Sequence, residues 1–190
     1  KAAFDSINAH SDQADKTIEI QIAGNTTDTA SAVLNQPAVA SWNSLTIYPT
    51  ATDTISGAFV GTLIDLNGAD NVVINGRLNK TGNPKSLTIS HTSNADNSNR
   101  TIRLINDAKN NIIQYSTITG KCPSTGAGVI FFSTTSGADG NDNNIIEYND
   151  INAMGAAAVG IGSTGTASPK DNSGNIIRNN NIFDFYLGNV

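Results

Sequence analysis

The stretch NNIIEYNDI, residues 143–151, recurs in similar form as GNIIRNNNI, residues 174–182. In both copies two adjacent isoleucines stand between asparagines, without the three- to four-residue spacing of apolar residues that an amphipathic helix needs. The wider pattern N-x-[IV]-x-x-[NSG]-x-[IL] occurs four times, starting at Asn71, Asn111, Asn144 and Asn175. The starts are 40, 33 and 31 residues apart, and self-similarity at such a period is typical of solenoid proteins.

A short strand-like run precedes each copy of the pattern. These runs are TLIDL from Thr62, TIRLI from Thr101, GVIFF from Gly128 and AVGIG from Ala158, and FYLGN from Phe185 begins another. Each unit holds two or three short β-type runs broken by Asn, Gly or Ser, which are too short for the crossover helices of a βαβ protein. A single unit of this size cannot bury an apolar face alone and must stack on its neighbours. We therefore predict an all-β chain folded as a parallel β-helix of about five coils.

Stacking in register would align equivalent side chains of successive coils in ladders. The pattern predicts two inward ladders and one row of corner residues: Val73, Ile113, Ile146 and Ile177; Leu78, Ile118, Ile151 and Ile182; and, at the corner, Gly76, Ser116, Asn149 and Asn180. Gly and Asn suit a sharp corner because they tolerate left-handed backbone angles. Asparagines stacked in register can also hydrogen-bond to one another along the ladder.

The N-terminal part reads as a cap followed by a less regular coil. In KAAFDSINA, residues 1–9, the apolar side chains fall on one helical face, so we predict a short capping helix. TIEIQI (17–22) and LTIYP (45–49) read as strands, and DTASAVLN (28–35) as a helical excursion. We expect one domain over residues 1–190, with the cap and irregular first coil in 1–61 and the regular coils in 62–190. The strand-like end FDFYLGNV suggests a fragment of a longer chain.

Composition excludes several classes of function. The chain has 26 Asn, 20 Thr and 17 Gly but only 14% charged residues, and its net charge of −5 argues against a nucleic-acid-binding surface. No apolar run approaches the ~20 residues of a membrane span, and no signal peptide is visible. The single cysteine, Cys122, excludes an internal disulfide and is best interpreted as a small buried thiol. We interpret His10 and His91 as surface residues, not as ligands or bases.

Two outward positions on adjacent coils carry opposite charges. If Ile64 and Ile102 point inward, Asp65 and Arg103 point outward and lie roughly 5 Å apart at sheet spacing. As a weak catalytic candidate, the pair would belong to a sugar-acid site in which Arg103 binds a uronate carboxylate. The favoured interpretation is a surface ion pair worth at most ~1 kcal/mol. Glycosidases need two positioned carboxyl groups, and the outward column formed by Asp65, Arg103 and the equivalent residues of the later coils contains one.

The segment GADGNDNN, residues 137–144, is a weak candidate for Ca²⁺. Asp139, Asn141 and Asn143 have the D-x-N-x-N spacing of an oxygen-rich calcium loop. However, Asn144 stands where such a loop has glycine, and a polar turn between coils explains the same residues. We therefore predict no bound cofactor and keep Ca²⁺ as an alternative.

An apolar column is also expected on the outside of one sheet. The residue after each repeat asparagine is Val72, Ile112, Ile145 and Ile176. Three or four aliphatic side chains in line are unusual on a free surface. Either the segment Thr26–Trp42 folds over the column, which we favour, or the column is an interface for a neighbouring domain or chain.

The segments TLIDLNGADNVVINGRLNKTG (62–82) and TIRLINDAKNNIIQYSTITG (101–120) also carry a resemblance to known proteins. They resemble right-handed parallel β-helices of the pectin-lyase-like fold, and more closely the repeat domains of large secreted bacterial surface proteins. The resemblance implies a secreted or cell-surface location. It leaves two functions open. One is a non-catalytic scaffold or adhesin-like module that binds glycan or another surface protein, and the other is a polysaccharide lyase or glycoside hydrolase.

Overall fold

The computed structural model describes residues 1–37, 41–155 and 157–185. Within these residues the regular structure is β-strand apart from one short helix, α1 (Ala2–Asn8), and one 3-10 turn, η1 (Leu78–Lys80). The strands pair in parallel and form three sheets of six, six and five strands. Five successive coils each contribute one strand to each sheet, and β16 and β17 add a sixth strand to two of the sheets, so the predicted parallel β-helix of about five coils is confirmed.

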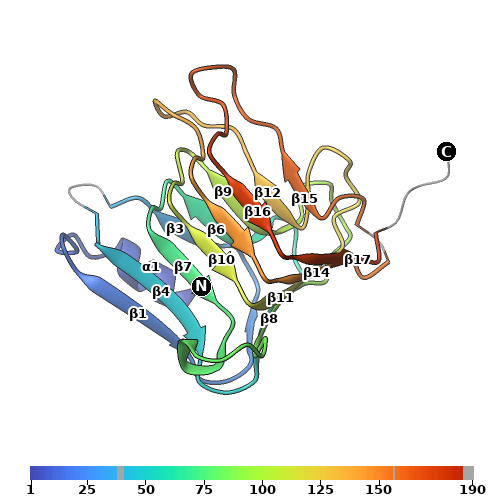
Figure 1. Ribbon diagram of the computed structural model, residues 1–190, viewed down its shortest axis with the longest axis horizontal. Coiled ribbons are helices and arrows are strands. Elements are labelled where there is room, and N and C mark those ends of the chain that lie inside the picture. The colour runs from blue at the N-terminus through green and yellow to red at the C-terminus, as the bar shows by residue number, and fades with distance from the viewer. Residues whose placement is uncertain (38–40, 156, 186–190) are drawn as a thin grey trace.

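The three sheets run along the length of the molecule, and sheet A faces the viewer in Figure 1. Sheet A contains β1 (Thr17–Ile22), β4 (Ser44–Pro49), β7 (Val72–Asn75), β10 (Ile112–Gln114), β13 (Ile145–Glu147) and β16 (Ile176–Arg178). Sheet B contains β2 (Thr26–Asp28), β5 (Asp53–Gly57), β8 (Leu87–His91), β11 (Ser116–Gly120), β14 (Asp150–Asn152) and β17 (Asn181–Phe183). Sheet C contains β3 (Ala32–Asn35), β6 (Thr62–Asn67), β9 (Arg100–Ile105), β12 (Ile130–Phe132) and β15 (Ile161–Ser163).

Isoleucine ladders fill the interior between the sheets. The sheet A ladder consists of Ile20, Ile47, Ile74, Ile113, Ile146 and Ile177. The sheet B ladder consists of Ile55, Ile89, Ile118, Ile151 and Ile182. Side chains in the middle of both ladders are inaccessible to solvent, as Ile118 and Ile146 illustrate. Removing such a side chain from water contributes about 1.5–3 kcal/mol to folding before the entropy of ordering is subtracted.

The first copy of the repeat has a different register from the predicted one. Ile74, not Val73, pairs with Ile113. Three consecutive aliphatic residues, Val72 to Ile74, allow two registers. In the observed register Val72 and Ile74 point into the core and Val73 points outward. Leu78 is also wrong as a ladder member, because it lies in η1 and is 41% exposed. An extended turn separates it from β8, where Ile89 takes its place beside Ile118.

Asparagine columns hold the corners of the coils together. Asn144 Oδ1 accepts a hydrogen bond from the backbone N–H of Asn111 on the preceding coil, at 2.9 Å. Its Nδ2 donates to the backbone oxygen of Ala108 (3.0 Å) and to Oδ1 of Asn175 (3.1 Å). The same arrangement recurs in two further columns, at Asn149 and Asn180 and at Asn141 and Asn172. The predicted hydrogen bonding between stacked asparagines is therefore confirmed.

The left-handed residues of the corners lie one position before the predicted ones. Between sheets A and B they are Tyr115 (φ 51°), Tyr148 (φ 56°) and Asn179 (φ 55°), not Ser116, Asn149 and Asn180. The side chains of Asn149 and Asn180 serve instead to accept and donate hydrogen bonds. The asparagines at the corner are thus selected for their carboxamides, and the turn itself accepts tyrosine.

The two ends of the stack differ. At the N-terminal end α1 caps sheet C: Asn8 Nδ2 donates to the Val33 oxygen at 2.8 Å, Asn8 Oδ1 accepts from the Asn35 N–H at 3.0 Å, and Phe4 is buried in the core. The predicted capping helix is confirmed, but DTASAVLN is not helical, since its second half forms β3. At the C-terminal end the ladder residues Ile177 and Ile182 are 50% and 46% exposed.

Candidate functional site

The outward pair Asp65 and Arg103 lies on neighbouring strands β6 and β9 in direct register. Arg103 donates from Nε to Asp65 Oδ1 at 2.9 Å and from a terminal nitrogen to Asp65 Oδ2 at 2.5 Å. This bidentate hydrogen bonding to Asp65 raises the pKa of Arg103. The Asp65 side chain is only 6% exposed and that of Arg103 28%. The pair is therefore a partly buried, internally satisfied ion pair, more enclosed than the exposed surface pair that we expected.

The column beyond this pair is apolar. Phe131 pairs with Arg103, and Gly162 follows on β15. Phe131 forms a small buried cluster with Cys122 and Ala127, which confirms the buried thiol, and burial raises the pKa of Cys122.

The three calcium candidates are engaged separately. Asn141 is fully buried in its asparagine column, where Nδ2 donates to the Ser133 oxygen at 2.7 Å. Asp139 lies at the surface and pairs with Lys109 Nζ at 2.8 Å, while Asn143 is an exposed turn residue with φ 57°. Across residues 1–37, 41–155 and 157–185 there is also no group of three or more His, Cys, Asp or Glu side chains that could hold a metal ion.

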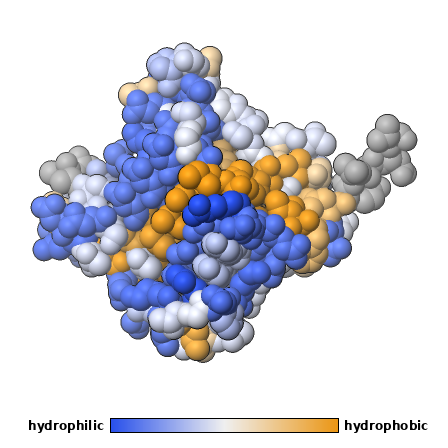
Figure 2. All heavy atoms as spheres, viewed as in Figure 1, coloured by the Kyte–Doolittle hydropathy of each residue, from blue (hydrophilic) through white to orange (hydrophobic). Residues whose placement is uncertain are grey.

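An apolar column does run along the outside of sheet A, with one change of membership. Val72 is fully buried and pairs with Leu45, so the outward column is Val73, Ile112, Ile145 and Ile176. Figure 2 shows a hydrophobic band across the face that sheet A presents. Exposure is intermediate along the column and reaches 44% at Ile176. In the segment Thr26–Trp42, which we expected to cover the column, the strands β2 and β3 belong to sheets B and C, and residues 38–40 lie outside the described residues.

His91 is a core residue, which corrects its interpretation as a surface residue. It is the last residue of β8, is only 1% exposed, and lies next to Gly57 and Gly120 on the neighbouring coils. Its ring packs edge-on against Phe59, with the ring centroids 5.1 Å apart. Neither ring nitrogen has a hydrogen-bond partner, and burial lowers the pKa of the imidazole. The alternation of Leu87, Ile89 and His91 along β8 could have predicted this inward position.

The sequence reasoning missed a stack of aromatic side chains at the corner between sheets A and B. Tyr115 and Tyr148 occupy the same place on successive coils, with ring centroids 4.8 Å apart and planes inclined by 14°. The guanidinium carbon of Arg77 lies 4.5 Å from the centroid of Tyr115. The signal was present in the sequence, because the two tyrosines are separated by 33 residues, the period of the repeat at that point.

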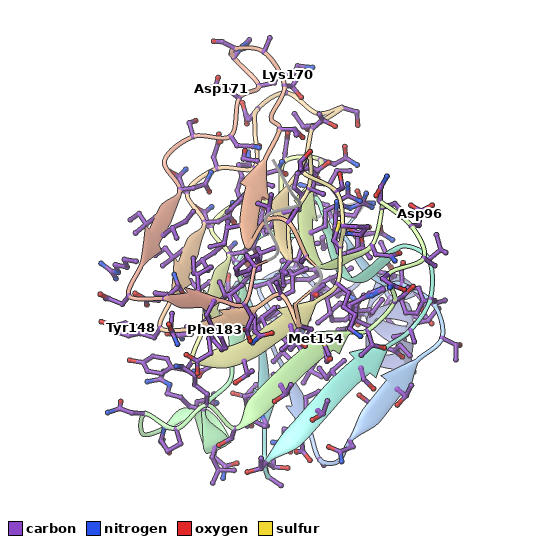
Figure 3. The ribbon with its side chains drawn as sticks, turned by 90° about the vertical axis from the view of Figure 1, so that its right-hand side faces the viewer. Asp96, Tyr148, Met154, Lys170, Asp171 and Phe183 are labelled. Carbon is purple, nitrogen blue, oxygen red and sulfur yellow. The ribbon has the colours of Figure 1, made fainter. Side chains whose placement is uncertain are left out.

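A groove of about 280 Å³ adjoins this stack. It is lined by Asn83, Lys85, Tyr115, Tyr148 and Asn179. Tyr148 is 38% exposed and projects at the periphery of the molecule in Figure 3, away from the core. The groove therefore offers aromatic surface, two carboxamides and an ammonium group to solvent.

A larger cavity of about 680 Å³ lies at the N-terminal end, beside α1. Its walls include the first members of the core ladders, Ile20, Ile47 and Ile55. It is the mouth of the coil interior that α1 only partly fills, so it belongs to the capping of the stack.

Comparison of the chain with protein-family models, curated proteins and solved structures finds no match in any of the three. In the described part of the chain, no helix has the length and hydrophobicity to span a membrane.

Proposed function

We propose that this chain is a non-catalytic module of a secreted or cell-surface protein, serving as a rigid scaffold with an adhesin-like binding surface. The proposal includes the finer assignment to the right-handed, pectin-lyase-like β-helices of large bacterial surface proteins. Glycan or another surface protein is the partner that such a module would bind.

The main support for the proposal is that the Asp65 carboxylate is fully engaged by Arg103. Both of its carboxylate oxygens accept hydrogen bonds from Arg103, and the next residues in the column are Phe131 and Gly162. Glycoside hydrolysis uses two carboxyl groups, one as acid and one as base or nucleophile, with a water or a sugar carbon between them. A single carboxylate bound on both oxygens to arginine is suited to joining two coils.

The regularity of the interior supports the scaffold role. Three asparagine columns join successive coils through buried hydrogen bonds. Fully satisfied polar networks of this kind rigidify a structure and fix its register. A stack of coils with fixed spacing presents its outward side chains at constant intervals, which suits the display of a repeated binding surface.

Incubation with insoluble and soluble polysaccharides, neutral and acidic, with and without Ca²⁺, tests the proposal. Protein left in solution and released unsaturated or reducing ends are measured in the same tube. We expect the protein to move onto at least one insoluble polysaccharide without any product. Product release that disappears in an Asp65→Asn variant would overturn the proposal and identify an enzyme.

A further inference from the structure

The tyrosine stack and the groove beside it are built from four successive coils. Asn83 and Lys85 come from the turn between β7 and β8, and Tyr115, Tyr148 and Asn179 from the equivalent corners of the next three coils. Neighbouring parallel strands lie about 4.7–4.9 Å apart, and the two rings repeat at 4.8 Å. The groove therefore runs along the axis of the β-helix and presents a surface that repeats at the coil spacing.

The two cations near this groove already have partners within the chain. Lys85 Nζ pairs with Asp150 Oδ1 at 2.7 Å, and the Arg77 guanidinium is held against the face of Tyr115. A cation over an aromatic face is attracted by the electron-rich π-system, so Arg77 fixes the Tyr115 end of the stack. An acidic ligand would have to compete with Asp150 for the Lys85 ammonium, whereas a neutral ligand can accept hydrogen bonds from that ammonium without breaking the pair.

The side chains that remain available are aromatic rings and carboxamides. Because Tyr148 stacks on one face of Tyr115 and Arg77 lies over the other, the stack presents apolar ring edges and hydroxyl groups to the groove. Asn83 and Asn179, one at each end of the groove, can each donate and accept hydrogen bonds. Apolar C–H faces combined with hydroxyl groups that both donate and accept are the properties of a pyranose ring. In an extended chain such rings recur at close to the spacing of the coils.

We propose that this groove binds an extended neutral glycan, a chain of β-1,4-linked pyranose units that lies parallel to the β-helix axis against Tyr115 and Tyr148. The inference rests on the proposed non-catalytic function and names the ligand class of its binding surface. Tyr148 is the residue on which binding depends most, because its ring is the more exposed of the two.

Asn179 shows which substitution will test the site without disturbing the fold. It occupies the place of Tyr148 on the next coil with almost the same backbone angle, φ 55° against 56°. Tyr148→Asn therefore removes the ring and keeps a residue that accepts the left-handed conformation. Tyr148→Phe keeps the ring and removes only the hydroxyl. Val60→Ala, at a site 60% exposed in the turn between β5 and β6, serves as a control for loss of apolar surface elsewhere.

Titration calorimetry with cellohexaose, xylohexaose, mannohexaose and hexagalacturonate measures the binding. We expect at least one of the three neutral hexasaccharides to bind. We also expect Tyr148→Asn to lower its association constant at least tenfold, and Tyr148→Phe and Val60→Ala to change it less than threefold. Thermal melts of all variants verify that they are folded.

Three results would overturn the inference: no binding of any neutral hexasaccharide, binding of hexagalacturonate alone, or binding that is unchanged by Tyr148→Asn. None of these would contradict the non-catalytic function. Shortened products in the calorimeter cell would instead overturn the proposed function, so the two failures are distinguishable.

Discussion

Replacement of Asn144 by alanine should be among the most damaging single changes on the inside of a corner. Asn144 is 1% exposed and makes three hydrogen bonds to neighbouring coils. Alanine would leave the backbone N–H of Asn111 and the backbone oxygen of Ala108 without their partners. Both residues are buried, at 1% and 0% exposure.

The size of the effect follows from these two groups. A buried donor or acceptor left without a partner costs about 1–3 kcal/mol, so Asn144→Ala should lower the free energy of unfolding by about 2–6 kcal/mol. For a chain of this size 1 kcal/mol corresponds to roughly 2–4 °C in melting temperature. The loss should therefore be plain in a thermal melt as well as in chemical denaturation.

Urea denaturation followed by circular dichroism measures the effect, with Asn94→Ala as the matched control. Asn94 is exposed in the turn between β8 and β9, and its replacement should change the unfolding free energy by less than about 0.5 kcal/mol. The slope of the transition must be the same in all three proteins for the comparison to hold. Equal losses in the two variants would refute the view that the asparagine columns hold the coils together.

Three further predictions concern the core and the ion pair. Ile146→Asn buries an unpaired amide and should cost about 3–5 kcal/mol in chemical denaturation, whereas Ile177→Asn, at a half-exposed position of the same ladder, should cost less than half as much. Burial lowers the pKa of His91 below its ordinary 6.5, so the unfolded chain binds the proton more readily than the folded chain. The free energy of unfolding should therefore fall as the pH drops below about 6.5. His91→Phe should flatten that pH dependence between pH 7.5 and 5.5. Arg103→Leu leaves the Asp65 carboxylate buried and alone and should cost about 3 kcal/mol, and combining it with Asp65→Leu should recover most of the loss; no recovery would mean that the pair is not the source.

Much of the fold could be predicted because stacking imposes the same requirement on every coil. Ile113, Ile146 and Ile177 follow asparagines at the same distance, and that spacing is enough to place them in one ladder. The prediction was wrong where the local sequence allows two solutions. The run Val72 to Ile74 satisfies either register, and only the pairing with both neighbouring coils, through Leu45 and Ile113, selects one.

The outward positions were harder to predict because no single requirement governs them. The apolar column of sheet A was expected, but its first member had to change with the register of β7. The helical excursion predicted for residues 28–35 was wrong for a related reason. DTASAVLN has small residues compatible with a helix, yet Ala32 and Leu34 complete the interior against Ile64 and Leu66, and this burial overrides local propensity.

The tyrosine stack shows where a binding surface can arise in such a chain. Inward positions are occupied mainly by aliphatic residues and asparagine because every coil must pack against and hydrogen-bond to its neighbours, and a ligand has no access to them. The side chain of a corner residue in the left-handed conformation is not required for packing between coils, as the change from Tyr148 to Asn179 on successive coils shows. The same side chain at that place on two consecutive coils is therefore not required by the stack. Function is best sought at outward columns that are more regular than folding demands, and the Tyr115–Tyr148 pair is such a column.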